Sequence, residues 1–366
     1  MSDFTDQSNL YVYQNRLVKI LLAPFAALYG LGVSLRDFFY RRGLLKGIEF
    51  DLPIIAVGNL TVGGAGKSPH IEYLIRLLKD HLDLATLSRG YKRKTKGFLQ
   101  VQRNSTVEEV GDEPFQFKTK FPDIRVAVCE SRTFAIPELK KLDPELDLVL
   151  LDDAFQHRSI RPGLNILLTE FSLPFTRDHL LPSGRLREWR SAYQRADIII
   201  VSKCPVDVRP QERLDLVAEI QPLPHQKVFF SFYQYGKPYF LFDRRYTTTL
   251  QADWEVVLIC AIASTDYLVG YLEEQVARVH SLEYEDHHYF TNLDIGQLKN
   301  FYDKLESDKK LVVTTEKDAT RLLAHRAFLL EHKIPVFVLP VEVDFLFGEA
   351  EVFDQTIRDF LLDFRQ

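Results

Sequence analysis

A glycine-rich stretch, TVGGAGKS, directly follows the apolar run LPIIAVGNL. Successive backbone N–H groups of such a loop can bind phosphate oxygens, while its lysine reaches the terminal phosphates, its serine hydroxyl ligates Mg²⁺ and the following helix presents its positive end. The usual pattern, G-x-x-x-x-G-K-[S/T], begins with glycine, and Thr61 stands at that position here. A tight strand-to-helix turn is the alternative, but it does not explain a Lys-Ser pair at the helix entry. We predict a phosphate-binding loop made of Thr61, Val62, Gly63, Gly64, Ala65, Gly66, Lys67 and Ser68.

A second apolar run ends in two adjacent aspartates, Asp152 and Asp153, within the segment LDLVLLDDAFQH at residues 146–157. The carboxyl ends of strands in a doubly wound sheet face the ligand crevice, so Asp152 and Asp153 should lie near Lys67. There they could hold Mg²⁺ with Ser68, directly or through water. The alternative is a helix N-cap aspartate with a solvated neighbour. Together the two motifs predict a site for ATP or GTP.

The segment SKCP at residues 202–205 helps to distinguish ATP from GTP as the nucleotide. A guanine-specific site usually carries N-K-x-D after a late strand, and the aspartate of that pattern is missing here. We therefore predict that ATP is the nucleotide.

Four further polar segments could act on an acceptor molecule. VGDEP at 110–114 is a sharp turn that opens a helix, so Asp112 and Glu113 could be capping residues or could act in catalysis. SRGYKRK at 88–94 is a basic loop. DHLLPSGRLREW at 178–189 mixes arginines with leucine and tryptophan, which suits an anionic amphiphile and equally suits a solvated surface. YEDHHYFT at 284–291 shows no metal-ligand spacing, but histidine is a residue type that could act in acid–base chemistry.

The elements that must position these residues alternate between strands and helices. Apolar residues in 70–82 have the spacing of an amphipathic helix, placed directly after the phosphate loop. Near-continuous apolar runs are typical of strands buried on both faces, as in a parallel sheet, and they occur at 53–57, 84–87, 124–128, 146–151, 164–168 and 198–201. We predict a P-loop-type, doubly wound α/β domain with a mostly parallel sheet.

The pattern changes near residue 228, where an aromatic, extended segment precedes a second and smaller α/β domain. The extended segment 341–347 could pair with the stretch near 230, which would make a two-strand connector. The predicted limits are 1–48 for an N-terminal helical segment, 49–228 for the P-loop domain, 229–347 for the second domain and 348–366 for a C-terminal helix.

The amino-acid composition indicates which classes of protein fit this chain. The chain has 366 residues, of which 46% are apolar and 27% charged, as in a globular protein without a large disordered part. Its formal net charge of −5 argues against a general nucleic-acid binder. The cysteines form no C-x-x-C pair and suggest a reducing compartment. No obligate protein partner is evident.

An apolar run, ILLAPFAALYGLGV at 20–33, is followed by basic residues and aromatic side chains. It is short for a spanning helix, which needs about 20 such residues, and the acidic start MSDFTD does not fit a signal peptide. Either the segment is a helix buried against the domain, or it is an amphipathic helix at a membrane surface, with arginines on anionic headgroups. The basic flank favours the membrane surface.

The motifs together closely resemble those of the tetraacyldisaccharide 4′-kinase family. VGNLTVGGAGKSP, SRGYKRK, VGDEP, DDAFQH, LLPSGRLRE, ADIIIVSK, EDHH and TTEKDA occur in the order seen in that family, and the likeness covers residues 17–345. The resemblance implies an ATP- and Mg²⁺-dependent enzyme of lipid A synthesis that phosphorylates the 4′-hydroxyl of an acylated glucosamine disaccharide. It also implies a peripheral location on the cytoplasmic face of the bacterial inner membrane. Members of the family have serine or threonine at the position of Thr61.

The resemblance also implies roles for particular residues. Lys67 and Ser68 would bind the ATP phosphates and Mg²⁺, and Asp152 and Asp153 would complete the metal site. Asp112 and His287 would form the catalytic dyad that deprotonates the sugar hydroxyl. Further active-site or substrate contacts would come from Tyr91, Glu113, His157 and Arg187.

Two positions depart from the family pattern. Ala154 stands where glycine is usual, which should be tolerated if its φ is not positive. The turn AIAST at 261–265 lacks the usual glycine and proline, so its geometry stays open. Two other functions compete with the lipid kinase: a nucleotide-dependent switch or metallochaperone of the P-loop GTPase type, and a P-loop kinase for a soluble small molecule.

Overall fold

The computed structural model describes residues 16–364 of the chain. The described residues fall into two compact units: a large unit, residues 16–233 and 343–364, and a small unit, residues 234–342. The chain leaves the large unit within strand β8 (Lys227–Tyr235) and re-enters it within β15 (Val341–Phe345). These two strands are neighbours in one sheet, which confirms the predicted two-strand connector. The domain limits drawn from the sequence stay a prediction.

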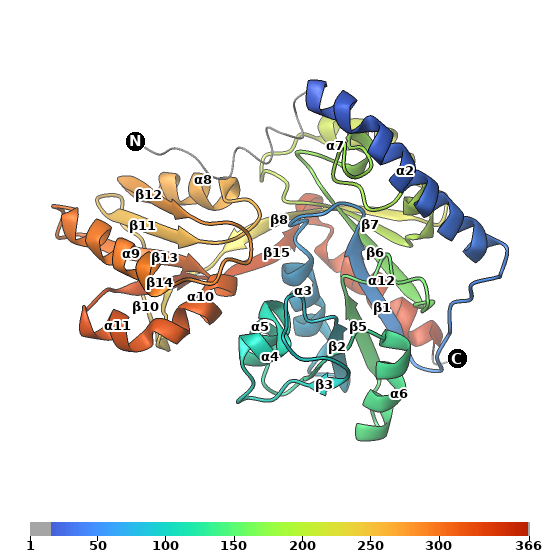
Figure 1. Cartoon of the computed structure of the whole chain (residues 1–366), viewed down its shortest axis with the longest axis horizontal. Coiled ribbons are helices and arrows are strands. Elements are labelled where there is room, and N and C mark those ends of the chain that lie inside the picture. Colours follow the sequence, from blue (N-terminus) through green and yellow to red (C-terminus); the bar gives the residue numbers. More distant parts are fainter. Residues whose placement is uncertain (1–15, 365–366) are drawn as a thin grey trace. The chain divides into compact units, whose positions relative to one another are not determined.

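A nine-stranded sheet of the described residues forms the centre of the large unit, in the order β15-β8-β7-β6-β1-β5-β2-β4-β3 (Figure 1). Its strands from β8 to β4 pair in parallel, and β3 pairs with β4 antiparallel. The remaining strands are β1 (Ile54–Asn59), β2 (Leu84–Ser88), β3 (Leu99–Gln100), β4 (Arg125–Val128), β5 (Leu148–Asp152), β6 (Leu164–Glu170) and β7 (Ile198–Ser202).

Helices cover both faces of this sheet, as the doubly wound class requires. They are α3 (Lys67–Leu78), α4 (Val107–Val110), α5 (Asp112–Lys120), α6 (Arg132–Leu142), α7 (Pro210–Ile220) and α12 (Ala350–Phe364), with 3₁₀ turns η1 (Phe175–Arg177), η2 (Arg190–Arg195) and η4 (Leu346–Gly348). Strand β1 shows the two faces: Ile55 and Val57 pack in the core of α3, α5 and α12, whereas Ile54 and Ala56 pack in the core of α6. The predicted α/β class is confirmed.

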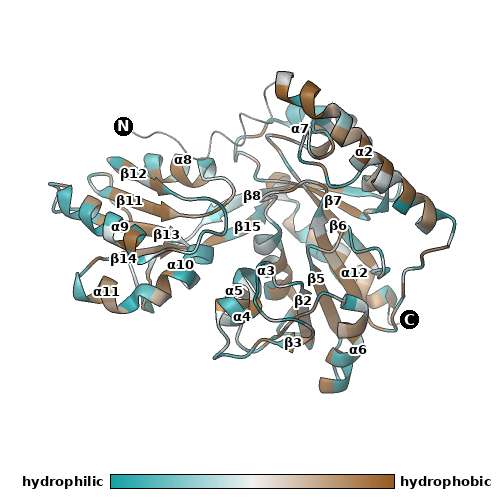
Figure 2. Ribbon diagram, in the orientation of Figure 1, coloured by the Kyte–Doolittle hydropathy of each residue, from teal (hydrophilic) through white to brown (hydrophobic). Residues whose placement is uncertain are grey.

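The small unit is also α/β. Its six-stranded sheet has the order β10-β9-β14-β13-β11-β12, parallel from β14 to β12 and antiparallel where β9 pairs with β10 and with β14. The strands are β9 (Tyr239–Phe240), β10 (Asp243–Thr247), β11 (Glu255–Cys260), β12 (Arg278–Glu283), β13 (Lys310–Thr315) and β14 (Val336–Leu339). The helices are α8 (Asp266–Gln275), α9 (Asn292–Lys304), α10 (Glu316–Leu322), α11 (Arg326–Glu331) and the 3₁₀ turn η3 (Leu323–His325). Figure 2 shows inner strands of both sheets, among them β1, β5 and β11, largely in the brown of hydrophobic residues, as expected of strands with two covered faces.

Helix α2 (Arg16–Arg41) precedes the large unit's first strand and is longer than the apolar run that predicted it. By length and composition alone, its residues Val18–Arg41 could cross a membrane. On one face, six large apolar side chains each expose more than half of their surface: Ile20, Leu21, Phe25, Leu28, Leu31 and Leu35. Few of its residues are buried, so the alternative of a buried helix is wrong, although the opposite face packs on the domain, as that alternative also supposed.

The opposite face of α2 packs on the loop at residues 178–190. Tyr29 donates to the backbone oxygen of Arg187 at 2.9 Å, and the indole of Trp189 donates to Ser34 at 2.9 Å. Gly30 lies under Trp189, where a Cβ atom would come within 2.7 Å of the indole ring. Glycine at this position lets the helix approach the loop closely.

Candidate active site

The glycine-rich loop joins β1 to α3 in the large unit, as predicted. Helix α3 begins at Lys67 itself, three residues before the predicted start, because Gly66 takes a left-handed φ of 82° and caps the helix. A Cβ atom at Gly66 would lie 2.6 Å from the hydroxyl oxygen of Tyr233. Glycine is therefore required at this position both by the backbone conformation and by the close approach of Tyr233.

Lys67 points back to the end of β1. Its Nζ lies 3.1 Å from Oδ1 of Asn59 and 3.6 Å from Oδ1 of Asp153. The first carboxylate of the pair, Asp152, is the last residue of β5 and pairs in register with Val57 of β1. The structure thus brings together the glycine-rich loop and the two aspartates, at the carboxyl ends of adjacent parallel strands.

The two aspartates differ in their surroundings. Asp152 is buried, and its Oδ1 has no hydrogen-bond partner among the described residues. Burial, reinforced by the charge of Glu113, raises the pKa of Asp152 to about 7. Burial would also raise the pKa of Asp153, but the positive charges of Lys67 and Arg187 outweigh it and hold that pKa well below its ordinary value. One carboxyl group is therefore poised to gain a proton while its neighbour stays ionised.

The guanidinium group of Arg187 forms a bidentate contact with the carboxylate of Asp153. Nη1 lies 3.1 Å from Oδ2 of Asp153 and Nη2 lies 2.9 Å from Oδ1. The loop that carries Arg187 is attached to the phosphate loop by backbone hydrogen bonds of 2.7 Å, from Val62 to Arg185 and from Arg187 to Leu60. Arg187 therefore reaches the site through a pairing of two segments that are far apart in the sequence.

Sequence reasoning missed Asn59, which connects these groups. Its buried side-chain oxygen accepts from Lys67 at 3.1 Å and from Arg187 at 2.6 Å, and its amide donates to the hydroxyl of Thr61 at 3.1 Å. The backbone oxygen of Asn59 also accepts from Gln156 at 2.8 Å. A polar residue at the end of a fully buried strand was the signal that could have identified Asn59. Its contact with Thr61 shows what a hydroxyl does at the first position of the loop.

A positive cluster adjoins the aspartates. Arg132 is fully buried, donates to the backbone oxygen of Asp152 at 3.3 Å, and has no hydrogen-bond partner among the described residues for Nε and Nη1. Burial and the charge of Arg89 lower the pKa of Arg132 to about 10, and burial together with both arginines lowers the pKa of His157 to about 4. Sequence reasoning missed Arg132, although a charged residue opening a helix directly after a strand was a usable signal.

The other predicted residues of the large unit lie as follows. Asp112 is buried as the first residue of α5, after Gly111 with a φ of 92°. Glu113 follows it, close enough to raise the pKa of Asp152. Tyr91 is exposed. Ala154 is buried without a positive φ, and Asp153 takes the left-handed conformation instead, so the extra methyl group is accommodated.

His287 belongs to the small unit, in the loop after β12, and has a left-handed φ of 64°. Its backbone N–H donates to Ala261 at 3.2 Å, so the unusual turn at 261–265 supports it directly. Arg321 and Lys317 of α10 lie beside its ring nitrogens, at 3.3 Å from Nδ1 and 3.2 Å from Nε2. The pairing of Asp112 with His287 stays a prediction.

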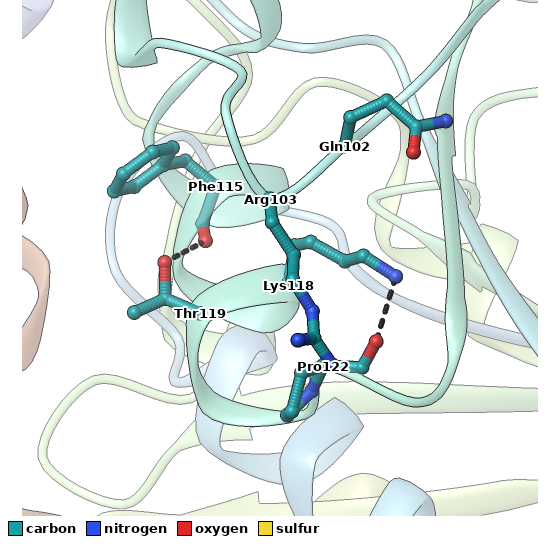
Figure 3. A pocket seen from close by; sticks show the side chains of 6 residues that line it. All are labelled: Gln102, Arg103, Phe115, Lys118, Thr119 and Pro122. Carbon is teal, nitrogen blue, oxygen red and sulfur yellow. Dashed lines mark hydrogen bonds between the residues drawn. The ribbon is translucent and has the colours of Figure 1, made fainter.

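A hollow of about 280 Å³ lies elsewhere in the large unit, lined by Gln102, Arg103, Phe115, Lys118, Thr119 and Pro122 (Figure 3). The ammonium group of Lys118 donates to the backbone oxygens of Pro122 and Ile124 at 2.9 and 2.8 Å. The ammonium group of Lys118 is thus bound by backbone oxygens of the protein itself. The hollow contains none of the predicted site residues.

The donor set at the strand ends suits Mg²⁺. Within residues 16–364 no group of three or more histidine, cysteine or acidic side chains is assembled as a metal site. Mg²⁺, however, usually takes one or two carboxylates and completes its shell with water and substrate phosphates. The unpartnered Oδ1 of Asp152, the carboxylate of Asp153 and the hydroxyl of Ser68 at the start of α3 fit that requirement.

Comparison with known proteins supports the same chemistry. The family model described as tetraacyldisaccharide-1-P 4′-kinase matches residues 18–362. A tetraacyldisaccharide 4′-kinase of Bacteroides fragilis is 43% identical over 343 residues, which cover 92% of this chain and 91% of the relative. One from Phocaeicola vulgatus is 41% identical over 355 residues, covering 95% and 97%. A crystal structure of LpxK from Aquifex aeolicus in complex with ATP superposes with a TM-score of 0.69 at 27% identity and covers 94% of this chain and 99% of that one.

Proposed function

The chain belongs to the tetraacyldisaccharide-1-P 4′-kinase family. We propose that it transfers the γ-phosphoryl group of ATP to the 4′-hydroxyl of a tetraacyl glucosamine disaccharide 1-phosphate in lipid A synthesis. The observation that supports this proposal best is the convergence of Lys67 and Arg187 on Asn59 and on Asp153, beside the buried carboxyl group of Asp152. Phosphoryl transfer depends mostly on positioning and on charge neutralisation, and this cluster offers both.

The residues of the large unit bind and orient the donor. Backbone N–H groups of the glycine-rich loop and the ammonium group of Lys67 would contact the phosphates of ATP. Ser68, Asp152 and Asp153 would hold Mg²⁺, which offsets the charge of the phosphates when it is bound. Lys67 would exchange its contact with Asp153 for the phosphates.

The acceptor is placed and deprotonated by other groups. We assign Asp112 and His287 as the catalytic dyad for the 4′-hydroxyl. Tyr91, Glu113, His157 and Arg187 are assigned to the acceptor side, supported by the pKa effect of Glu113 on Asp152 and by the positive cluster around His157. A low pKa keeps His157 neutral at physiological pH, so it would bind the acceptor by hydrogen bonding and not by charge.

Two competing functions are less well supported. A switch protein or metallochaperone of the GTPase type is not favoured, because the matched family and the relatives are kinases and the guanine-specific aspartate is missing. A kinase for a soluble small molecule does not require the exposed apolar face of α2. Lipid-anchored acceptors do require contact with a membrane surface, which a helix with one apolar face and basic flanks provides. We therefore assign a peripheral location on the cytoplasmic face of the inner membrane, where ATP is supplied, with no nucleic-acid or obligate protein partner.

The deciding experiment incubates the protein with γ-labelled ATP and the disaccharide 1-phosphate in detergent micelles. Label at the 4′ position of the wild-type product, and none with Asp112→Asn, is the expected result. Lys79→Met, at the exposed C-terminal end of α3, is the matched control for Lys67→Met and should keep full activity. Label that stays in ATP or appears only as free phosphate would contradict the proposal.

Membrane binding is tested by a variant of α2 that leaves its packed face intact. Leu21, Phe25 and Leu28 are exchanged together for serine, and sedimentation with vesicles containing anionic lipid is measured. We expect the variant to stay in the supernatant while the nucleotide affinity is unchanged. Co-sedimentation equal to that of the wild type would exclude α2 as the membrane contact.

A further inference from the structure

The histidine in the first turn of α3 is buried directly behind the phosphate loop. His70 exposes only 3% of its surface, and both of its ring nitrogens have partners within the large unit. Nδ1 lies 2.7 Å from the backbone oxygen of Gly66, and Nε2 lies 2.9 Å from the hydroxyl oxygen of Ser231. The ring therefore joins the last glycine of the loop to β8, the strand within which the chain leaves the large unit.

The contacts of the ring decide which of its nitrogens carries the proton. A carbonyl oxygen only accepts hydrogen bonds, so Nδ1 must be the donor to Gly66. The opposite tautomer would place the lone pair of Nδ1 against that oxygen at 2.7 Å. Burial lowers the pKa of His70 to about 4, although the bond to Gly66 favours the charged form. The ring is therefore neutral at physiological pH, and Nε2 accepts from Ser231.

The ring takes the place of a weak hydrogen bond of the helix. The carbonyl oxygen of an N-cap residue accepts the first intrahelical bond, which in α3 runs from the N–H of His70 to Gly66. That distance is 3.4 Å, whereas Nδ1 of the same residue lies 2.7 Å from the oxygen. The orientation of the Gly66 carbonyl group thus depends mainly on the imidazole ring.

A second peptide group of the loop is held in a similar way. The hydroxyl of Ser202, at the buried end of β7, donates to the backbone oxygen of Ala65 at 2.9 Å, with a more distant acceptor in β6 at 3.2 Å. A trans peptide group is planar, so its N–H points away from its C=O. The N–H groups of Gly66 and Lys67 therefore point away from the side chains that hold the two carbonyls. Neither donates to an acceptor in the part of the chain that the structure describes.

We propose that His70 is a positioning residue of the phosphate loop: as the Nδ1–H tautomer, paired with Ser231, it holds the Gly66 carbonyl so that the N–H of Lys67 faces the nucleotide phosphates. This inference rests on the proposed function, because it concerns how the same site binds ATP. N–H groups that are oriented before the ligand arrives lose little conformational freedom on binding, so the affinity for nucleotide depends on this contact. His70 acts through Gly66 and not by touching the nucleotide.

The tautomer is measured by NMR at pH 7 on wild-type protein with ¹⁵N-labelled histidine. The ring signals are assigned to His70 by through-bond correlation with its backbone. We expect a proton on Nδ1 and an unprotonated Nε2 whose shift shows that it accepts a hydrogen bond. Because free histidine favours the proton on Nε2, this result requires the contacts of the buried ring. A proton on Nε2, alone or together with one on Nδ1, overturns the proposal whatever the variants do.

Two double variants then test the hydrogen bond to Gly66. His70→Leu with Ser231→Ala removes the donor without leaving the serine hydroxyl unpaired, whereas His70→Asn with Ser231→Ala keeps an amide donor near the position of Nδ1. Binding of ADP with Mg²⁺ is measured by calorimetry. We expect the leucine variant to bind at least about fivefold more weakly than wild type, as for the loss of one orienting hydrogen bond, and the asparagine variant to recover most of that affinity.

Leu74→Ala is the matched control for lost packing. Leu74 is buried in the core of the large unit, one turn further along α3. Its truncation should lower the stability in urea unfolding and leave the affinity for ADP unchanged. The proposal is contradicted by a leucine variant that binds ADP like wild type, by an asparagine variant as weak as the leucine variant, or by an equal loss of affinity in Leu74→Ala.

Kinase assays on the same proteins distinguish this inference from the proposed function. The leucine variant should raise the KM for ATP and leave the KM for the disaccharide unchanged. Wild-type protein that binds ADP but does not phosphorylate the disaccharide refutes the proposed acceptor and leaves the inference standing. Wild-type protein that is active with the His70 proton on Nε2 refutes the inference alone, and wild-type protein that does not bind ADP refutes both.

Discussion

Replacing Asp152 by asparagine should stabilise the large unit while removing kinase activity. In the unfolded chain this carboxyl group ionises with its ordinary pKa of 3.8, whereas in the folded chain its pKa is about 7. The raised value means that the contribution of Asp152 to stability is complete below pH 3.8 and is lost as the pH rises to 7. Asparagine does not ionise, so the variant avoids this loss.

The difference between the two pKa values sets the magnitude. Each pKa unit corresponds to about 1.4 kcal/mol, so the full effect above pH 7 is on the order of 4 kcal/mol. At pH 5 only the first part of this loss has occurred. The free energy of unfolding of Asp152→Asn, relative to wild type, should therefore rise by about 3 kcal/mol between pH 5 and pH 8.

Urea unfolding of both proteins across this pH range, without nucleotide or Mg²⁺, measures the difference. The neighbouring variant Asp153→Asn is the matched control. It loses the contacts with Lys67 and Arg187 that hold the pKa of Asp153 low, so it should be less stable than wild type at pH 8. Both variants should lose turnover. A stability gain of Asp152→Asn that does not grow with pH, or a loss at pH 8, would refute the reasoning from burial.

Three further substitutions test the site. Lys67→Met should lower kcat by orders of magnitude in the kinase assay while the protein still folds, and a nearly normal kcat would exclude Lys67 from transfer. Gly66→Ala should destabilise the protein by about 1–2 kcal/mol for the left-handed φ alone, with a further loss from contact with Tyr233. Adding Tyr233→Phe should recover only that further loss in a double-mutant cycle, and recovery of the whole loss would contradict the role of φ. Asn59→Ala should weaken ATP binding in calorimetry, because Lys67 and Arg187 lose the side-chain oxygen to which both donate hydrogen bonds. An unchanged affinity would show that Asp153 alone positions them.

The sequence predicted the parts of the site that depend on local pattern. The buried strand that ends in two aspartates and the loop that ends in Lys67 follow from spacing, and both lie where the parallel sheet requires. The opposite pKa shifts of Asp152 and Asp153 could not be predicted from spacing. The pKa of Asp152 is raised by its burial and by the charge of Glu113, whereas the pKa of Asp153 is lowered by Lys67 and by Arg187, which lies 34 residues from Asp153 in the sequence. Neighbours in sequence thus acquire different chemistry from their partners in space.

Asn59 and Arg321 show the same limit. The polar residue at the end of β1 stands out only because its strand is fully buried, and one arginine among many charged residues after β13 has no distinctive spacing. Their importance follows from what they contact: Lys67 and Arg187 for Asn59, and His287 for Arg321. Helix α3 illustrates a smaller error, since its start depends on the left-handed conformation of Gly66 and not on the apolar pattern that follows.

The packing of α2 has a consequence for how the enzyme would reach its acceptor. The helix presents exposed leucines on one face and contacts the Arg187 loop with the other, through Tyr29 and Trp189. An α-helix is about 10 Å wide, so this single element would set the height of the arginine loop above the lipid surface. A disaccharide whose acyl chains remain in the bilayer would meet the loop at a constant level, and diffusion within the plane of the membrane would be enough to bring the two together.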